Sequence, residues 1–153
     1  MITIKEGDLF SAPKGVICHQ VNCKGNMGRG VAKTFREKFP HAFKQYVEYC
    51  HAFEGKDILG DVLIMREDPY NVDTCCMFAQ DDWRGYGCNT DYAAFHQCCD
   101  EIKDYIYNTK EYNYPINMPY NIGCGLGGGD WQIVYSILEE EFENYNLILW
   151  RLK

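Results

Sequence analysis

The sequence of 153 residues lacks a long apolar run and an excess of positive charge. Its first residues already include Lys5, Glu6 and Asp8, so we expect neither a signal peptide nor a membrane span, and we expect the chain to be cytoplasmic. The net charge of −7 argues against non-specific binding of nucleic acid, which normally needs clustered lysine and arginine. If the ligand is an anion, backbone amides must therefore hold it.

Cysteine is abundant, but its spacing argues against two common uses. Nine cysteines are an odd number in a chain without a predicted secretion signal, so we expect reduced thiols rather than a disulfide framework. No C-x-x-C pair occurs, and the pairs Cys75-Cys76 and Cys98-Cys99 are adjacent, whereas structural zinc ligands usually stand about two to four residues apart. We therefore expect no metal site and no cofactor. Repeats, linkers and low-complexity segments are also lacking, which favours one domain.

Strand and helix patterns alternate along the chain. The predicted strands are residues 2–5, 15–21, 61–65, 73–79, 116–118 and 147–152. Helices are predicted at 28–39, from Pro40 onward, after a cap at Thr90, and after a cap at Asp130. Cys98 and Cys99 fall on the apolar stripe of the third helix, which favours core filling over chemistry. Residues 81–89 are predicted to be a loop. This order predicts an α/β fold in three layers, with helices on both faces of one sheet.

The stretch from Ile122 to Trp131 contains five glycines and leads directly into a helical pattern. Glycine lets successive N–H groups turn toward one point, and the helix adds unpaired N–H groups and the positive end of its dipole. The stretch therefore predicts a phosphate-binding loop, with a flexible turn as the alternative. A second glycine-containing loop, residues 21–32, also follows a strand and enters a helix. Together the two loops are placed to hold opposite sides of a diphosphate.

Two other nucleotide-binding motifs do not fit. Neither glycine loop ends in Gly-Lys followed by Ser or Thr, which excludes a standard Walker A loop. A dinucleotide fingerprint starting at Gly123 needs an acidic residue after the next strand, and that strand runs to Lys153 without one.

Three motifs in order resemble the macro domains, which are modules that bind ADP-ribose. They are Gly7-Asp8-Leu9-Phe10, the run His19-Gln20-Val21-Asn22-Cys23 leading into residues 27–32, and Ile122-Gly123-Cys124-Gly125-Leu126. The sequence is most similar to the branch that contains terminal ADP-ribose protein glycohydrolase and the antitoxin that removes ADP-ribose from DNA. The resemblance implies a single macro domain over residues 1–153, with a three-layer α/β/α fold and a mixed central sheet. It also implies ADP-ribose or an ADP-ribosylated substrate as the partner. Separately from the resemblance, we expect a monomer, although the sequence leaves the oligomeric state open.

The resemblance implies roles for individual residues. Asp8 is expected to accept a hydrogen bond from the adenine amino group, Asn22 to contact the distal ribose, and Trp150 to stack near the adenine. The alternatives are ordinary turn residues for Asp8 and Asn22 and a core position for Trp150. The full set of expected ligand-binding residues is Asp8, Leu9, Asn22, Met27, Gly28, Gly30, Val31, Gln80, Gly123, Cys124, Gly125, Leu126 and Gly127.

The sequence also departs from the hydrolases of that branch. Where the protein-directed glycohydrolase has an aspartate after its Gly-Cys-Gly-Leu stretch, this chain has Gly127. The segment 78–84 lacks the lysine of both hydrolases, and Gln80 is its best match. The candidate catalytic residues are therefore Asn22, Asp130, Asp82 and His19, acting on water rather than through a lysine. Asp130 as a helix cap and His19 as a core residue are the alternatives.

We therefore expect an ADP-ribose-binding protein that hydrolyses ADP-ribosyl linkages or ADP-ribose-1″-phosphate. A binding module without turnover is the alternative, and a protein that binds NAD-derived nucleotides would use the same pocket. Cys23 is a weaker candidate nucleophile, because a thiol needs a neighbouring base to lower its pKa.

Overall fold

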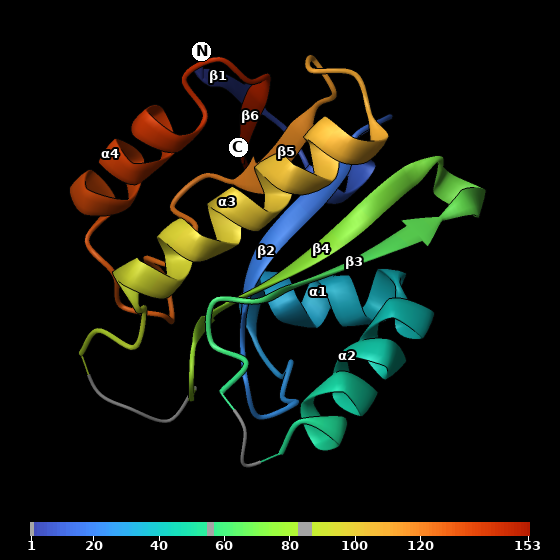
Figure 1. Ribbon diagram of the computed structural model, residues 1–153, viewed down its shortest axis with the longest axis vertical. Coiled ribbons are helices and arrows are strands. Elements are labelled where there is room, and N and C mark those ends of the chain that lie inside the picture. Colours follow the sequence, from blue (N-terminus) through green and yellow to red (C-terminus); the bar gives the residue numbers. More distant parts are fainter. Residues whose placement is uncertain (1, 55–56, 83–86) are drawn as a thin grey trace.

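The computed structural model describes residues 2–54, 57–82 and 87–153 (Figure 1). In these ranges the strands form one mixed sheet of six in the order β1-β6-β5-β2-β4-β3. Neighbouring strands are parallel except for β3, which runs antiparallel to β4 at one edge. The strands are β1 (Ile2–Glu6), β2 (Val16–Asn22), β3 (Val62–Glu67), β4 (Val72–Gln80), β5 (Ile116–Pro119) and β6 (Leu147–Arg151).

Helices cover both faces of this sheet. On one face α1 (Gly30–Lys38) and α2 (Pro40–Ala52) pack over a core that includes Phe35 and Tyr46. On the other face α3 (Tyr92–Thr109) and α4 (Trp131–Glu141) cover a separate core. The 3-10 helices are η1 (Leu9–Ser11) and η2 (Asp68–Tyr70). This arrangement confirms the predicted three-layer α/β/α fold. None of the described helices combines the length and the apolar character that a membrane crossing requires.

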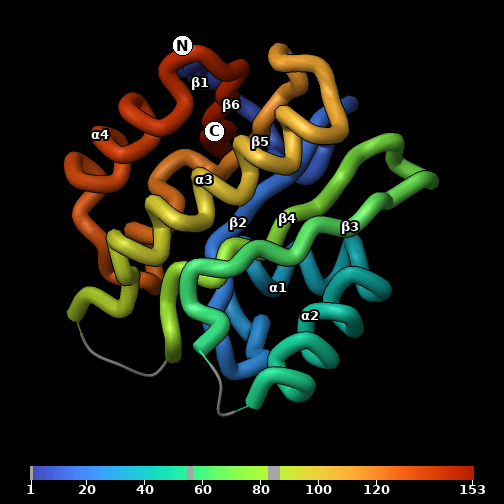
Figure 2. The backbone as a smooth tube through the Cα atoms, viewed as in Figure 1, coloured from blue at the N-terminus to red at the C-terminus, as the bar shows by residue number. Residues whose placement is uncertain are grey.

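The central strands are hydrophobic on both faces because helices cover both of them. In β4 every residue from Val72 to Ala79 is buried, and β2 is nearly as enclosed. Cys98 and Cys99 on α3 are both fully buried in the core, as their place on the apolar stripe predicted. Figure 2 follows the chain from β1 to β6, which pair in parallel, so the first and last strands are neighbours.

Three details differ from the expectations. Helix α1 begins at Gly30 rather than at residue 28, and Val31, an apolar residue of the predicted helix 28–39, is exposed and not buried in the core. The cap of α3 is Asp91, whose side chain accepts a hydrogen bond from the Ala94 N–H at 2.9 Å, and not Thr90. Asp91 lies one residue closer to the first turn, so its carboxylate reaches the free N–H groups there. The predicted loop at 81–89 includes residues 83–86, which lie outside the described residues.

The topology brings the loops of interest to one edge of the sheet. Strand β2 pairs with both β4 and β5 in parallel, so the carboxyl ends of these three strands lie together. The chain leaves β2 toward α1 on one face and leaves β5 toward α4 on the other face. Ligands of open α/β sheets bind where connections diverge in this way.

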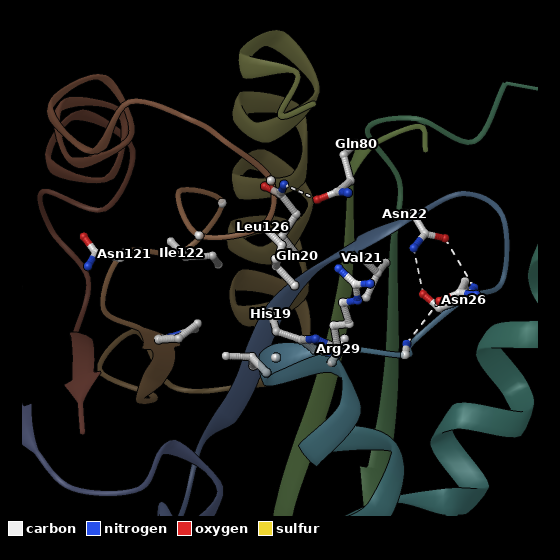
Figure 3. A pocket seen from close by; sticks show the side chains of 18 of the residues that line it. His19, Gln20, Val21, Asn22, Asn26, Arg29, Gln80, Asn121, Ile122 and Leu126 are labelled. Atoms are coloured by element: carbon white, nitrogen blue, oxygen red, sulfur yellow. Dashed lines mark hydrogen bonds between the residues drawn. The ribbon is translucent and has the colours of Figure 1, made fainter. Parts of the chain in front are cut away.

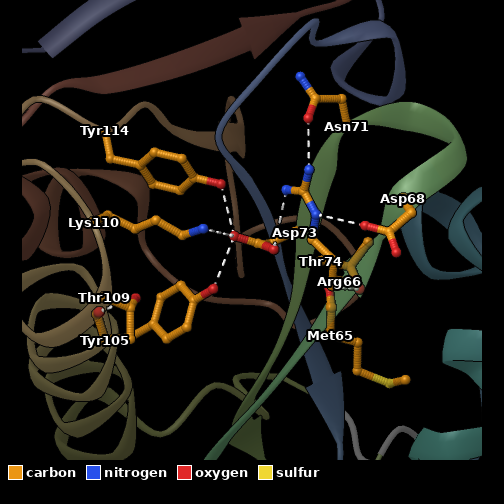
Figure 4. A network of polar contacts seen from close by, with 10 residues as sticks. All are labelled: Met65, Arg66, Asp68, Asn71, Asp73, Thr74, Tyr105, Thr109, Lys110 and Tyr114. Carbon is orange, nitrogen blue, oxygen red and sulfur yellow. Dashed lines mark hydrogen bonds and ion pairs between the residues drawn. The ribbon is translucent and has the colours of Figure 1, made fainter.

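The opposite end of the sheet is fastened by a buried carboxylate (Figure 4). Asp73, at 1% exposure, accepts hydrogen bonds from the hydroxyls of Tyr105 at 2.9 Å and Tyr114 at 2.7 Å. Arg66 and Lys110 lie 3.5 and 3.6 Å from its oxygens and balance its charge. Burial, followed by this carboxylate, raises the pKa of Tyr105 to about 12, so the phenol stays a donor. The network ties α3 and the loop after it to the β3–β4 hairpin.

Candidate functional site

A cavity of about 490 Å³ lies at the carboxyl ends of β2, β4 and β5 (Figure 3). The two predicted glycine loops form much of its wall. The expected ligand-binding residues that line it are Asn22, Gly28, Gly30, Val31, Gln80, Gly123, Gly125, Leu126 and Gly127. His19 lines it as well. The sequence reasoning missed Gln20, Val21, Asn26, Arg29, Ala32, Pro119, Tyr120, Asn121 and Ile122. The sequence could have indicated these residues by their position, because each of them lies inside or beside a predicted glycine loop or the end of a predicted strand.

Asn22 shapes the first loop from within. Its Oδ1 accepts hydrogen bonds from the N–H groups of Lys24 at 3.0 Å and Asn26 at 3.3 Å and from the Tyr46 hydroxyl at 2.9 Å. Its Nδ2 donates to the Asn26 carbonyl at 2.7 Å. An amide nitrogen carries two hydrogens, so one donor of Asn22 is left for a ligand. Asn22 therefore both holds the loop in place and presents a single donor at the strand end.

The second loop is held by its neighbours along most of its length. The Thr90 hydroxyl donates to the Gly123 carbonyl at 2.7 Å, and the Thr90 N–H donates to the Gly127 carbonyl at 3.1 Å. A Cβ on Gly127 would lie 2.8 Å from the Thr90 Oγ1, and one on Gly128, at φ +71°, would lie 2.0 Å from the Gly87 carbonyl oxygen. These glycines are therefore required by the packing of the loop itself.

Gly125 differs from those glycines. It lines the cavity, its φ is not positive, and a Cβ built on it meets nothing within 4 Å. Beside it Leu126 is exposed, and its Cδ1 lies 3.6 Å from where a Cβ on Gly30 would be. The two loops therefore approach each other at the mouth of the cavity, with the backbone of Gly125 open to a ligand.

His19 belongs to β2, and its side chain packs against α1. Its ring packs against that of Phe35, with centroids 4.2 Å apart and the planes tilted by 34°, and its Nε2 lies 3.8 Å from the Cys76 Sγ. The side chain is 1% exposed, and its Nδ1 has no hydrogen-bond partner among the described residues. Burial lowers the pKa of His19 to about 3, because the enclosed site disfavours the charged ring. Near neutral pH the imidazole is therefore uncharged.

Two glutamine side chains join the strand ends of β2 and β4. Gln20 Nε2 donates to Gln80 Oε1 at 2.7 Å and to Thr90 Oγ1 at 2.8 Å, while Gln80 Nε2 donates to the Asp82 carbonyl at 3.1 Å. Gln80 stands where the resemblance expects a lysine, and an amide cannot act as an amine nucleophile. Residues 83 and 84 of the segment 78–84, in which the resemblance expects this lysine, lie outside the described residues. Gln20 Oε1 has no hydrogen-bond partner among the described residues, and a Cβ built on Gly123 would lie 2.8 Å from it.

The charges around the cavity are few. Arg29 is the only lysine or arginine among the described residues that line it, and no described aspartate or glutamate lines it. Arg29 is the N-cap residue of α1, and its side chain makes no capping hydrogen bond. Figure 3 shows the side chain reaching from the start of α1 toward the middle of the pocket. The wall therefore offers backbone and amide donors, one cation and no competing carboxylate.

Several expected ligand residues lie away from the cavity lining. The Asp8 side chain caps η1 by accepting from the Phe10 N–H at 2.9 Å, and Leu9 and Met27 are buried in the core. Cys124 packs against the other core, and burial, with smaller contributions from Asp130 and Cys88, raises its pKa to about 11. Trp150 is partly buried and donates its Nε1–H to Asn117 Oδ1 at 2.9 Å.

The two candidate carboxylates also lie outside the lining. Asp130 is exposed and caps α4, accepting from the Gln132 N–H at 2.9 Å, which is the alternative that the sequence allowed. Asp82 follows β4 and accepts from Gln80 through its backbone carbonyl. Burial raises the pKa of Cys23 to about 12, with a smaller contribution from Asp81, so its thiol stays protonated near neutral pH.

Comparison with known proteins gives a consistent result. The family model described as "Macro domain" matches residues 18–138. A protein of Candida albicans named ADP-ribose 1″-phosphate phosphatase is 31% identical over 94% of this chain and 95% of its own length. A protein of Lodderomyces elongisporus with the same name is also 31% identical, over 91% of this chain and 92% of its own.

Solved structures share the fold. The macrodomain of Mycobacterium tuberculosis DarG superposes with a TM-score of 0.83 at 23% identity, covering 98% of this chain and 97% of that one. Thermosipho africanus DarTG, solved in complex with ADP-ribose, superposes with a TM-score of 0.77 at 18% identity, covering 97% of this chain and 41% of that one.

Proposed function

Because this chain belongs to the macro domain family, we propose that it binds ADP-ribose and hydrolyses the terminal phosphate of ADP-ribose-1″-phosphate. The observation that carries the proposal is the cavity between two amide-rich loops at the carboxyl ends of β2, β4 and β5. The proposed compartment is the cytoplasm, which is supported by nine unpaired cysteines.

The cavity suits a nucleoside diphosphate sugar. Its volume of about 490 Å³ lies within the usual range of about 300 to 1,000 Å³ for small-molecule sites. Open amides at Gly125 and uncapped amides at the start of α1 supply donors for phosphate oxygens. No described carboxylate in the lining repels the phosphates. The contact with the distal ribose that the resemblance implies for Asn22 is compatible with the place of this residue in the wall.

Phosphate removal is favoured over a lysine-dependent cleavage of ADP-ribosyl bonds. Gln80, at the position of the expected lysine, is held by Gln20 and by the Asp82 carbonyl. The two relatives compared over nearly their whole length carry the phosphatase name. Both considerations support water, rather than a side-chain amine, as the attacking group.

The proposed reaction is hydrolysis of a phosphate monoester. Water oxygen attacks the phosphorus, the bond between phosphorus and the anomeric oxygen breaks, and the proton lost by water ends on that oxygen. His19 is the group proposed to pass this proton, because the residue lines the cavity and its uncharged ring has an Nδ1 without a hydrogen-bond partner among the described residues. Asn22 positions the distal ribose through its remaining Nδ2 hydrogen. The products are ADP-ribose and inorganic phosphate.

The test uses purified protein, three candidate substrates and the ligand ADP-ribose. ADP-ribose-1″-phosphate should release phosphate, while ADP-ribosylated protein and ADP-ribosylated DNA should stay intact, and ADP-ribose should bind in calorimetry. His19→Gln should lower kcat about a hundredfold or more. The exposed His51, changed to Gln, is the matched control and should leave kcat unchanged.

The outcomes separate the candidate functions. Binding of ADP-ribose without turnover of any substrate would make the chain a binding module. Cleavage of an ADP-ribosylated macromolecule would move the activity to the glycohydrolases. Full activity of a folded His19→Gln protein would remove His19 from the proposed proton transfer.

A further inference from the structure

One wall of the cavity carries the positive charge of Arg29. Arg29 forms no ion pair with any described residue, although Lys24, five residues earlier in the same loop, lies 3.5 Å from the Asp81 carboxylate. No described carboxylate lines the cavity. A guanidinium in this setting is available for a ligand anion, and its planar fork matches two phosphate oxygens at once.

The start of α1 offers anion-binding groups at the same wall. Gly30 is the first residue of this helix, and the N-cap side chain leaves the first N–H groups uncapped. Gly30, Val31 and Ala32 all line the cavity. The buried His19 supplies an independent sign of a ligand, because its Nδ1 lacks a described partner although the side chain is almost fully enclosed. Figure 3 shows His19 and Arg29 on this side of the pocket, across from Ile122 and Leu126.

The cavity wall therefore carries two kinds of anion-binding group, the open backbone at Gly125 and the guanidinium of Arg29. We propose that Arg29, with the first turn of α1, binds the terminal phosphate of the substrate and determines the preference for the phosphorylated sugar over ADP-ribose. The inference rests on the proposed function, because it assigns one phosphate of that substrate. A terminal phosphate monoester adds a charge of about −2 near pH 7, which ADP-ribose lacks. Loss of this group in the reaction removes the contact with Arg29 and favours release of the product.

The experiment compares binding and turnover of the two ligands. Wild type, Arg29→Gln and Arg29→Lys are measured with ADP-ribose by calorimetry and with ADP-ribose-1″-phosphate by phosphate release. The matched control is Lys33→Gln, which removes an exposed cation one turn later on α1, outside the cavity lining. Arg29→Gln should lower kcat/KM about 10-fold to 100-fold, as expected for a lost charge-assisted hydrogen bond. Its Kd for ADP-ribose should change less than about twofold, and Arg29→Lys should retain part of the wild-type kcat/KM because it keeps the charge.

A binding measurement keeps the inference separate from the proposed function. If wild type hydrolyses neither ligand, the proposed function fails, and binding of both ligands can then be compared directly. Tighter binding of ADP-ribose-1″-phosphate than of ADP-ribose, lost in Arg29→Gln and kept in Lys33→Gln, would still support the phosphate site. Equal weakening of both ligands would place Arg29 on the shared diphosphate and overturn the inference. Unchanged binding and turnover in Arg29→Gln would overturn it as well.

Discussion

Gly125 provides a sharp test of where the diphosphate binds. The change is Gly125→Val, which adds three carbons at a position that lines the cavity. The backbone there does not need glycine, since φ is not positive and an added Cβ meets nothing within 4 Å. The valine should leave the loop folded and obstruct only a ligand that approaches its amides.

The expected loss of affinity follows from the contacts that the side chain would block. A hydrogen bond from a backbone amide to a charged phosphate is worth about 1.5 to 3 kcal/mol. Loss of one or two such bonds corresponds to about a 10-fold to 20,000-fold rise in the Kd for ADP-ribose. The melting temperature should stay within about 2 °C of the wild type, because the added atoms extend into open space.

Calorimetry with ADP-ribose and thermal unfolding of the same samples give the two readouts. The contrasting variant is Gly128→Ala, where φ is +71° and the added Cβ would lie 2.0 Å from the Gly87 carbonyl oxygen. That protein should lose stability, in addition to any loss of binding, because the loop must move. A folded Gly125→Val protein that binds ADP-ribose as tightly as wild type would show that the diphosphate does not lie against this loop.

Three further predictions concern His19, Tyr46 and Asp130. The pKa of His19 is about 3 in the folded protein and 6.5 in the unfolded chain, so the unfolded chain takes up a proton first as the pH falls. Between these two values, each pH unit below 6.5 lowers the free energy of unfolding by about 1.4 kcal/mol. Urea unfolding should show the wild type losing about 2 to 3 kcal/mol more than His19→Gln between pH 7.5 and 4.5. Parallel losses in the two proteins would contradict the buried neutral ring. Tyr46→Phe removes the hydroxyl that donates to Asn22 and should lower the free energy of unfolding by about 1 to 3 kcal/mol and weaken ADP-ribose binding, whereas an unchanged melt would show that Asn22 does not depend on it. Asp130→Asn keeps a capping oxygen and should keep kcat within about twofold, while Asp130→Ala should cost about 1 kcal/mol of stability; a hundredfold loss of kcat in Asp130→Asn would make the carboxylate part of the reaction.

Sequence patterns predicted the layers of the fold because apolar periodicity and burial have the same cause. The stripe with Cys98 and Cys99 lies in the core, and the apolar residues 75–79 of β4 are all buried. Helix ends were predicted less well. Thr90 and Asp91 are both good capping residues, and only the tertiary contact of Thr90 with the glycine loop decides between them.

The candidate site was only partly visible in the sequence for a different reason. Glycine motifs mark the loops, so Gly125 and Gly30 were found, but a run of glycines does not show which ones face the ligand. Gly127 and Gly128 are explained by close contacts with Thr90 and Gly87, which are distant in the sequence or lie in another loop. A side chain such as that of Arg29 belongs to no local sequence pattern. Its importance follows from the lack of a carboxylate among the described residues that line the cavity.

The cavity combines recognition by backbone amides with recognition by one guanidinium, in a chain of net charge −7. Clustered cations would bind any polyanion, whereas amides fixed by Thr90 and Asn22 bind only where the phosphate oxygens match their positions. A single guanidinium at the other wall then adds a charge where one ligand has a phosphate and the other a hydroxyl. At physiological salt, charge interactions between exposed groups are screened beyond about 8 Å. The attraction between Arg29 and an anionic ligand therefore acts only once the ligand has entered the cavity. Discrimination between phosphorylated substrate and product is therefore made at short range, inside the cavity, and not during approach.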